Sequence, residues 1–321
     1  MKTFRPLLIL VLVGTLALPT VHASWFRREP PRPGRTTLGN PLVTLPAQLI
    51  NNYLIITVKW DRRGPYNFLI DTGASTTLIS PVLAERYGHP PLPLDRHDVT
   101  VQSADGDATV LRSTILKRLE LGDARFEEVT ALIYDCTPIS VHLGIRIDGI
   151  LGFPLFRETL LTLDYPHSQV LLATRASATA TAPGTSLPFN NDRQIPLVPL
   201  RLGEQTFYAL IDSGSDAALQ LNPRGLHLDF TRQPRPGAII TTLTGNRRQM
   251  VARLDQTIHL GDYALVRPII DVTDEFPSLG GETLRHFSIQ FDQERHLVTF
   301  YRESRTPVIF PPRRSTGLSF T

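Results

Sequence analysis

The sequence predicts an all-β protein built from two similar lobes, each a β-barrel or a folded sheet. Two observations predict this. Short runs of β-branched and aromatic residues alternate with Gly and Pro turn clusters along the chain, as is typical of all-β proteins. The second half of the chain also repeats the sequence anchors of the first half at matching spacings, which indicates an internal duplication.

The strands of the first half can be assigned in order. Runs that predict strands lie at residues 54–59, 66–70, 99–102, 109–111, 126–134 and 160–163. A turn cluster containing Gly and Pro separates the first two runs, and Asp105-Gly106 lies between the next two, which is a strong hairpin signal. Helical periodicity is confined to short segments such as residues 81–87 and 154–158.

The duplication is clearest at two anchors. Residues 68–74 and 209–215 each contain an apolar strand followed by Asp, a hydroxyl residue and Gly. A Leu-Gly pair follows at 151–152 and at 279–280, and an Asp stands 12 residues after the Gly of each pair. Such agreement in spacing is hard to obtain by chance. A low-complexity stretch at residues 176–186 separates the copies and predicts an interdomain linker.

Each copy places one carboxylate at the end of an apolar strand, Asp71 in the first and Asp212 in the second. The following Gly73 and Gly214 allow tight turns whose backbone amides face the acid. If the turns meet between the lobes, the two carboxylates share one proton, because like charges so close do not both ionise cheaply. The ionised acid can then take a proton from water while the other donates to a substrate carbonyl. This arrangement hydrolyses a peptide bond without a covalent intermediate.

These motifs resemble those of the pepsin/retropepsin group of aspartic proteases, in the bacterial form with two retropepsin-sized lobes in one polypeptide. The resemblance rests on residues 71–74, 212–215 and 148–152, and it covers the chain from about residue 41 to residue 310. It implies a bilobal pepsin-like acid protease fold with the active site between two homologous retropepsin-like lobes. It also implies an aspartic endopeptidase with a peptide or protein substrate, no cofactor and no metal.

The same resemblance gives roles to the residues beside the two catalytic acids. Thr72 and Ser213 would cross-link the two loops through their hydroxyls, and residues 148–152 would pack beneath the first loop. The supporting loops comprise Thr72, Gly73, Ala74, Ser213, Gly214 and Ser215. The substrate-binding flap comprises Ser103, Ala104, Asp105 and Gly106, and it lacks the Tyr that pepsin-like enzymes carry there.

The resemblance also predicts which acid holds the shared proton. In that family, a hydroxyl three residues after the catalytic Asp often bonds the carboxylate, which lowers its pKa. The second copy has this hydroxyl at Ser215, whereas the first has Ala74. We therefore expect Asp71 to hold the proton more often than Asp212.

The second copy departs from the first in ways that leave other functions open. Gly280 follows Asp274 by 6 residues, whereas the first copy has 17 residues between the matching positions, and Ser278 replaces an apolar residue. Asp216 adds an acid near the pair; it is either a solvated side chain or a like charge that raises the pKa of the pair. A catalytically inactive periplasmic binding or scaffold protein is therefore the alternative to an enzyme. A third possibility is an enzyme in which two copies of the first lobe, from different chains, pair with each other.

The composition limits the classes of molecule that the protein is expected to bind. The formal net charge is +3 and no long basic stretch is interleaved with aromatic residues, so nucleic acid is not expected to bind. The His residues are scattered without zinc-ligand spacing. Cys136 is the only cysteine, which excludes an intramolecular disulfide, and a semi-buried hydrophobic role is expected for it. We expect a monomer.

The ends of the chain predict export. Residues 1–23 have a basic start, an apolar run at 7–18 and a small-residue cleavage site ending at Ala23, as in a signal peptide. The segments then expected are an Arg/Pro-rich tether at 24–40, lobes at 41–175 and 187–310, and a tail at 311–321. The protein would be periplasmic or secreted, or anchored to the inner membrane if the signal is not cleaved.

Overall fold

A computed structural model describes residues 34–60, 63–90, 98–102, 108–177, 184–242 and 245–311. The predicted signal peptide, the flap residues Ser103, Ala104, Asp105 and Gly106, and nearly all of the tail lie outside this range. The two strands that flank the flap residues pair antiparallel, with Gln102 opposite Ala108. The described part of the chain is mostly β, so the all-β prediction is confirmed.

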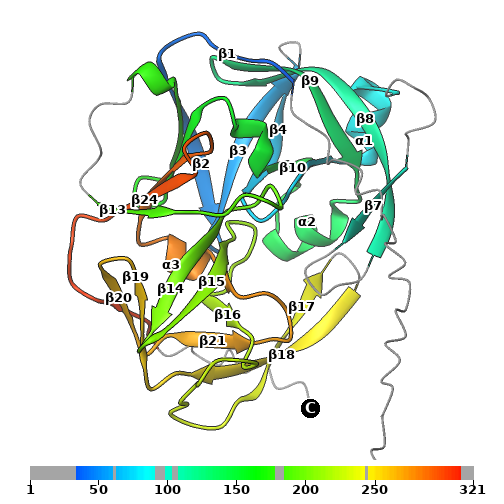
Figure 1. The fold of residues 1–321 in the computed structure, drawn as a ribbon. Helices are drawn as coiled ribbons and strands as arrows, with labels where there is room; N and C mark the ends of the chain where they lie inside the picture. The colour runs from blue at the N-terminus through cyan, green and yellow to red at the C-terminus, as the bar shows by residue number, and fades with distance from the viewer. Residues whose placement is uncertain are drawn as a thin grey trace, which may run out of the picture.

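The described strands form two sheets (Figure 1). The first has 15 strands, with the main order β13 (Thr185–Pro188), β24 (Leu297–Tyr301), β23 (Ser288–Asp292), β11 (Leu160–Asp164), β12 (Gln169–Ala173), β2 (Leu42–Ile50), β3 (Tyr53–Trp60), β4 (Arg63–Asp71), β10 (Gly149–Gly152), β5 (Thr77–Ile79), β9 (Ala124–Ile133), β8 (Ala108–Leu121) and β6 (Gly88–His89). The strands β1 (Thr36–Leu38) and β7 (Asp98–Gln102) pair with β9 and β8, respectively.

The second sheet contains ten strands from the second half of the chain. Their order is β17 (Arg235–Thr242), β18 (Gly245–Arg253), β21 (Ile269–Val272), β16 (Leu219–Leu221), β22 (Ser278–Leu279), β15 (Gln205–Ile211), β14 (Leu197–Leu202), β19 (Thr257–Leu260), β20 (Tyr263–Val266) and β25 (Val308–Ile309). The described helices are short: α1 (Pro81–Tyr87), α2 (Thr137–Leu143), α3 (Gly281–Leu284), and two 3₁₀ turns at Phe153–Phe156 and Arg175–Ser177.

Local sequence explains the first helix, which was predicted. Ser80 caps its N-terminus by accepting a hydrogen bond from the N–H of Leu83, and Pro81 occupies the first turn, where its missing N–H costs nothing. The helix predicted at 154–158 is a 3₁₀ turn instead. In the described residues no helix is long and apolar enough to cross a membrane.

The same strand pattern surrounds both acids. In the first half, β10 runs parallel to β4 and antiparallel to β5. In the second half, β22 runs parallel to β15 and antiparallel to β16. The two Leu-Gly anchors therefore lie beside the strands that carry Asp71 and Asp212, as the duplicated spacing suggests.

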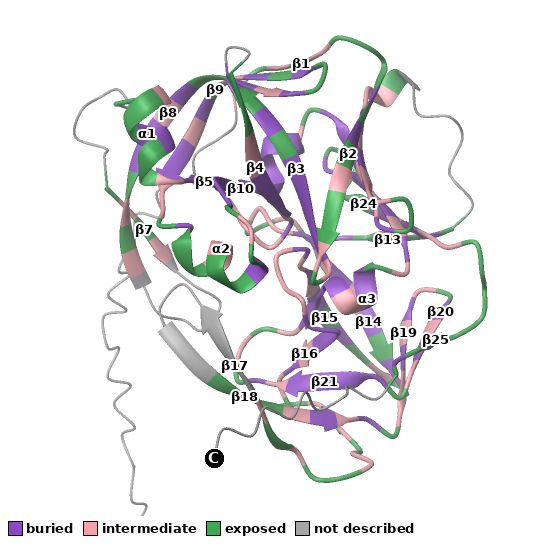
Figure 2. Ribbon diagram, turned by 180° about the vertical axis from the view of Figure 1, so that it is seen from behind, coloured by how far each residue is buried: buried purple, intermediate pink, exposed green. Residues whose placement is uncertain are grey.

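The two halves share one ladder. Antiparallel strands β11 and β23 pair over five residues, from Leu160 opposite Asp292 to Asp164 opposite Ser288. Through this ladder, β13, β23 and β24 of the second half belong to the first sheet. The core is also continuous across the halves, since the rings of Phe153 and Phe291 are centred 5.2 Å apart, and buried residues extend through both halves in Figure 2.

Two predicted irregular segments contain strands. The tether predicted at 24–40 includes β1, which pairs with β9 through Thr36 opposite Phe126. The linker predicted at 176–186 includes the start of β13, where Thr185 pairs with Phe300. Both corrections have one physical cause, because a neighbouring sheet edge supplies hydrogen-bond partners that a local sequence window does not reveal.

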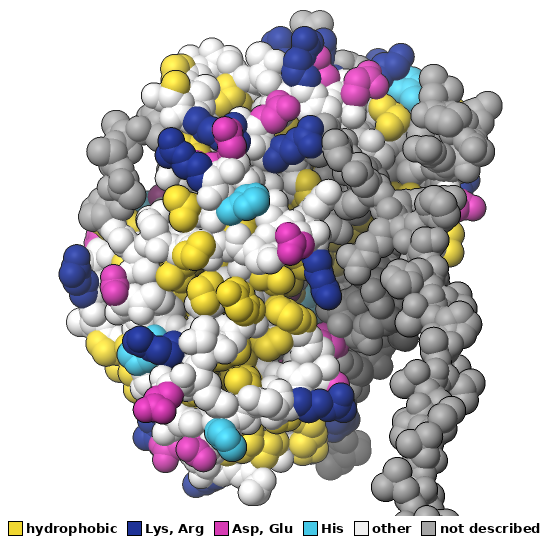
Figure 3. All heavy atoms as spheres, in the orientation of Figure 1, with side chains coloured by type: hydrophobic (Ala, Val, Ile, Leu, Met, Phe, Trp, Pro, Cys, Tyr) yellow, Lys and Arg dark blue, Asp and Glu magenta, His cyan; other side chains and the backbone are white. Residues whose placement is uncertain are grey.

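Charged side chains of both signs are interspersed over the face of the molecule shown in Figure 3, and hydrophobic side chains gather near its middle. This mixing agrees with the small formal net charge of +3.

Candidate active site

The two acids lie at equivalent strand ends. Asp71 is the last residue of β4, and Asp212 directly follows β15. The residues before them, Ile70 and Ile211, are fully buried. Each strand therefore carries its acid out of an apolar core and into a turn.

The carboxyl groups of Asp71 and Asp212 are hydrogen-bonded to each other. The glycine of each turn packs against the opposite acid. A Cβ atom added to Gly214 would lie 2.3 Å from Cγ of Asp71, and one added to Gly73 would lie 2.6 Å from Oδ1 of Asp212. Both distances are too short for a side chain, so glycine is required here for close approach.

Hydroxyl groups tie the two turns together beneath the acids. Thr72 and Ser213 are both fully buried. Thr72 Oγ1 donates to the carbonyl of Ile211 at 2.6 Å, and Ser213 Oγ donates to the carbonyl of Ile70 at 2.9 Å. Each hydroxyl therefore reaches the backbone of the opposite strand and fixes the separation of the acids.

Burial raises the pKa of both acids. For Asp71 the pKa rises to about 6, although N–H groups of Gly73 and Ala74 oppose the rise by donating to Oδ1 at 2.8 and 3.1 Å. For Asp212 burial is again the largest cause, and the negative charge of Asp71 raises the pKa further, to well above its ordinary value. One proton is therefore shared between the two groups. Two backbone N–H groups donate to Asp71 and one donates to Asp212, which favours Asp71 as the ionised member of the pair.

This assignment reverses the expectation that Asp71 holds the proton. The expectation relied on a hydrogen bond from Ser215 to Asp212, but the Ser215 hydroxyl instead accepts the N–H of Ala217 at 3.3 Å. Asp71 is favoured as the ionised acid because more backbone N–H groups stabilise its charge. The N–H groups of Gly73 and Ala74 point at the carboxylate of Asp71 because of the geometry of the turn. The side-chain types in the sequence do not encode this direction, which determines the acid that is ionised.

Asp216 has partners from the other half of the chain, which neither sequence interpretation included. Its carboxylate lies 3.7 Å from Nε2 of His142 on α2. The Tyr53 hydroxyl is hydrogen-bonded to the Asp216 backbone, and Asn52 Nδ2 donates to its carbonyl at 3.3 Å. The residue after the second turn is thus held by three side chains of the first half.

Two aromatic residues beside the pair were missed by sequence reasoning. The pKa of Tyr53 is raised mainly by burial and then by Asp216, Asp212 and Asp71. The pKa of Tyr165 is also raised mainly by burial and then by Asp212 and Asp71. The Tyr165 hydroxyl is buried and has no hydrogen-bond partner in the described part of the chain. Its position directly after one of the repeated Asp anchors was the only sequence signal for it.

The described residues give little support to catalysis by a cysteine thiolate or to a metal site. Cys136 is buried and its Sγ contacts the carbonyl of Tyr134 at 3.6 Å. Burial raises the pKa of this thiol to about 12, so the reactive thiolate is scarce near neutral pH. Within the described residues no group of three or more His, Cys, Asp or Glu side chains could hold a metal ion.

Comparison with known proteins supports an aspartyl protease family. Residues 56–155 match the model of the aspartyl protease family. The match includes Asp71 and the β10 strand beside it but ends before Asp212. Comparison with curated proteins gives no match. The assignment of Asp212 to the same site therefore rests on the geometry described above.

Proposed function

We propose that the protein is an aspartic endopeptidase in which Asp71 and Asp212 act as a pair. The observation that carries the proposal is the mutual hydrogen bond between two buried carboxyl groups whose pKa values are both raised. A pair that shares one proton contains a base and an acid at the same place, which is what peptide hydrolysis through water requires.

The residues have distinct roles in this mechanism. Ionised Asp71 accepts a proton from a water molecule while that water attacks the carbonyl carbon of the scissile peptide. Protonated Asp212 donates its proton to the carbonyl oxygen, which gives a neutral tetrahedral gem-diol. Asp71 then gives its proton to the leaving nitrogen while Asp212 accepts a proton from one hydroxyl of the gem-diol. Cleavage of the C–N bond yields a carboxyl product and an amine product and restores both acids to their starting states. No covalent enzyme intermediate forms.

The finer features belong to the same proposal. We propose a two-lobed pepsin-like enzyme of the bacterial kind, supported by the matching strand pairings around the two acids. Its substrate would be an extended peptide bound between the lobes and covered by the hairpin of β7 and β8. We also propose export through the signal segment at 1–23, on sequence grounds alone.

A peptide library tests the proposal. Purified protein is incubated with mixed peptides at pH 3 to 8, and new termini are identified by mass spectrometry, with Asp71→Asn and Asp212→Asn as matched variants. Cleavage by the wild type alone supports the pair. Saturable peptide binding without cleavage at any pH would favour the inactive binding protein, and cleavage that survives Asp212→Asn would indicate pairing of first-half copies from two chains.

A further inference from the structure

A second apolar cluster covers the face of the first-half sheet on which Asp71 lies. Side chains two residues apart on a strand point to the same face, so Leu69 lies on the face of Asp71. Leu69 belongs to a row of apolar residues that crosses five paired strands. The row comprises Ile55, Leu69, Ile150, Leu78 and Leu132. All five are buried, and the exposed fraction of Leu69 is 1%.

Helix α2 and the loop after it close this face. Leu143 at the end of the helix and Ile147 beyond it are buried in the same cluster as the row. Both belong to residues 134–148, which connect β9 to β10. The first half therefore fills the face beside its acid with its own chain.

The second half lacks this cover. Its strands β21 and β22 are joined by residues 273–277, all of which the structure describes, and these residues form no helix. The row that corresponds to the first-half row has apolar residues only at its first two positions. It comprises Leu197, Leu210, Ser278, Gln220 and Asp271. The helix and the fully apolar row that it covers are therefore both particular to the first half.

Farther along the same face, the second half exposes two aromatic side chains. Tyr208 stands two residues before Leu210 and is 53% exposed. Phe276 stands two residues before Ser278 and is 46% exposed. Because Leu210 pairs with Ser278 in parallel strands, the same register extended by two residues places Tyr208 beside Phe276.

The first half shows that residues at these two positions are neighbours. There the positions are held by Asn67 and Asp148, and the N–H of Asn67 donates to Oδ2 of Asp148 at 3.0 Å. The carbonyl of Asn67 in turn accepts the N–H of Asp148 at 2.8 Å. A polar pair that is bonded internally is thus replaced in the second half by two aromatic rings, each about half exposed.

The aromatic pair lies on the face that carries the second acid. Along β15 the intervening residues Ala209 and Ile211 are buried in the core, so Tyr208 and Asp212 both point to the opposite face. Four residues of strand separate them, a distance of about 13 Å. An extended peptide covers that distance in about four residues. A peptide that lies across the two acids can therefore reach the rings with one side chain.

We propose that Tyr208 and Phe276 form a substrate subsite for one large apolar side chain, with aromatic rings preferred. Edge-to-face packing of rings and removal of apolar surface from water both stabilise such a contact. The placement of the peptide rests on the proposed peptidase function. Because α2 fills the corresponding face of the first half, the preference is one-sided. It applies on one side of the scissile bond and not at the mirror position on the other.

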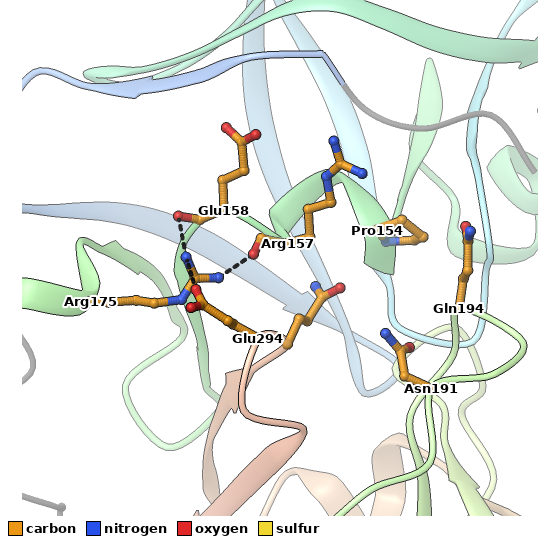
Figure 4. Close-up of a pocket in the computed structure, with 8 residues that line it drawn as sticks. Pro154, Arg157, Glu158, Arg175, Asn191, Gln194 and Glu294 are labelled. Carbon is orange, nitrogen blue, oxygen red and sulfur yellow. Dashed lines mark hydrogen bonds and ion pairs between the residues drawn. The ribbon is translucent and has the colours of Figure 1, made fainter.

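A pocket of about 420 Å³ between the two halves is the competing place for a substrate side chain. Figure 4 shows polar side chains around it, with Arg175 held by Glu294 at 2.8 Å and by the backbone carbonyl of Arg157. An apolar side chain would bury these charged groups without offering them hydrogen bonds. The pocket therefore does not favour the same ligand, and a variant at Glu294 serves as a control.

Affinity selection tests the subsite without relying on catalysis. The full chain carrying Asp71→Asn is immobilised and incubated with a randomised octapeptide library, and the bound peptides are sequenced by mass spectrometry. We expect Phe, Tyr, Trp and Leu to be enriched in the bound peptides. A selected peptide and its analogue with that residue replaced by Ala are then compared by titration calorimetry. The analogue should bind at least about fivefold more weakly.

Variants locate the contact. Adding Tyr208→Ser together with Phe276→Ser should remove the difference between peptide and analogue, whereas Tyr208→Phe keeps the ring and should retain it. Two controls should also retain the difference. They are Val141→Ser, at a residue of α2 that is 77% exposed, and Glu294→Gln in the pocket. Circular dichroism verifies that each variant is folded.

Cleavage by the wild type tests the one-sided preference. The library peptides that are cleaved are aligned at the scissile bond, and we expect large apolar residues to be enriched at one position on one side only. Equal enrichment at the mirror position, no enrichment in the bound peptides, or a peptide–analogue difference that survives the double Ser variant would each overturn the inference. If no peptide is cleaved, the proposed function fails, while the selection still supports or overturns the subsite.

Discussion

Thr72 and Ser213 exchange a reciprocal pair of hydrogen bonds, in which the backbone N–H of each residue donates to the hydroxyl of the other. The two donor–acceptor distances are 2.9 Å from Thr72 N and 3.0 Å from Ser213 N. Since each hydroxyl also donates to a carbonyl of the opposite strand, one four-bond network determines how far apart the two acids sit.

Loss of one hydroxyl from this network should destabilise the whole protein. Thr72→Ala leaves the N–H of Ser213 and the carbonyl of Ile211 buried without partners, at about 1–3 kcal/mol each. Urea denaturation should show a loss of about 2–6 kcal/mol in the free energy of unfolding. Thr72→Ser keeps the hydroxyl and should lose far less. The exposed hydroxyl of Thr206 provides a control, and a Thr72→Ala protein no less stable than Thr206→Ala would contradict the network.

Removal of either acid should abolish cleavage. Asp71→Asn removes the base and Asp212→Asn removes the acid, and a pair that shares one proton has no working half. We expect kcat/KM to fall by about 10³ or more in both variants, with unchanged circular dichroism. Near-normal turnover in the Asp212→Asn protein would show that the second half takes no part in catalysis.

The pH dependence of activity should be displaced toward neutrality. Asp71 must be ionised, and its pKa is raised to about 6, mainly by burial. Asp212 must be protonated, and its pKa is also raised well above its ordinary value, mainly by burial. The profile of kcat/KM, which reports the free enzyme, should therefore rise through about pH 6 and fall only at higher pH. A maximum near pH 3 would contradict these pKa directions.

Ser215→Ala should leave both limbs of that profile in place. Its hydroxyl accepts the N–H of Ala217, and within the described part of the chain it makes no hydrogen bond to the carboxyl group of Asp212, so its removal takes no hydrogen bond from that acid. If the alkaline limb moves by half a pH unit or more, then Ser215 does bond the acid and the proton assignment needs revision.

The free energy of unfolding should fall as the pH rises through the titration of the acid pair. A salt-bridged acid, whose pKa is lowered in the folded state, has the opposite effect. The folded-state pKa of Asp71 lies above the ordinary value, so the folded protein binds more protons and the free energy of unfolding falls from about pH 4 to about pH 6. The slope approaches about 1.4 kcal/mol per pH unit, and Asp212 extends the decline upward.

The double variant Asp71→Asn/Asp212→Asn lacks this decline and serves as the reference. Subtracting its stability curve removes other titrating groups, such as His286, whose pKa is lowered to about 4 mainly by burial. A difference curve that is flat between pH 4 and pH 6, or that rises with pH, would show that burial does not raise the pKa of the pair.

A structural feature could be predicted from the sequence where the residues that specify it lie close together in the chain or recur in both halves. Helix α1 could be predicted because Ser80 and Pro81 form a start signal within two residues. Helix α2 could not, because its segment is rich in β-branched residues and Cys136 at its N-cap makes no side-chain capping bond. The helix exists through tertiary contacts, which override propensity.

The details of the candidate site depend on long-range packing. The contact between His142 and Asp216 joins residues from different halves, and no spacing rule links them. The proton assignment follows from backbone amide directions around Asp71, which depend on the turn geometry rather than on residue types. The duplicated motif predicted that two acids would matter, but not which of them would be charged.

The ladder between β11 and β23 is centred on Thr162 and Gln290, which face each other. These strands are duplicates, so their antiparallel register is one that either strand could also adopt with a second copy of itself. The join between the halves is therefore a two-fold interface held within one polypeptide. Tethering keeps the partner strand at a high effective concentration whatever the protein concentration, so a buried edge that would otherwise require dimerisation is always covered.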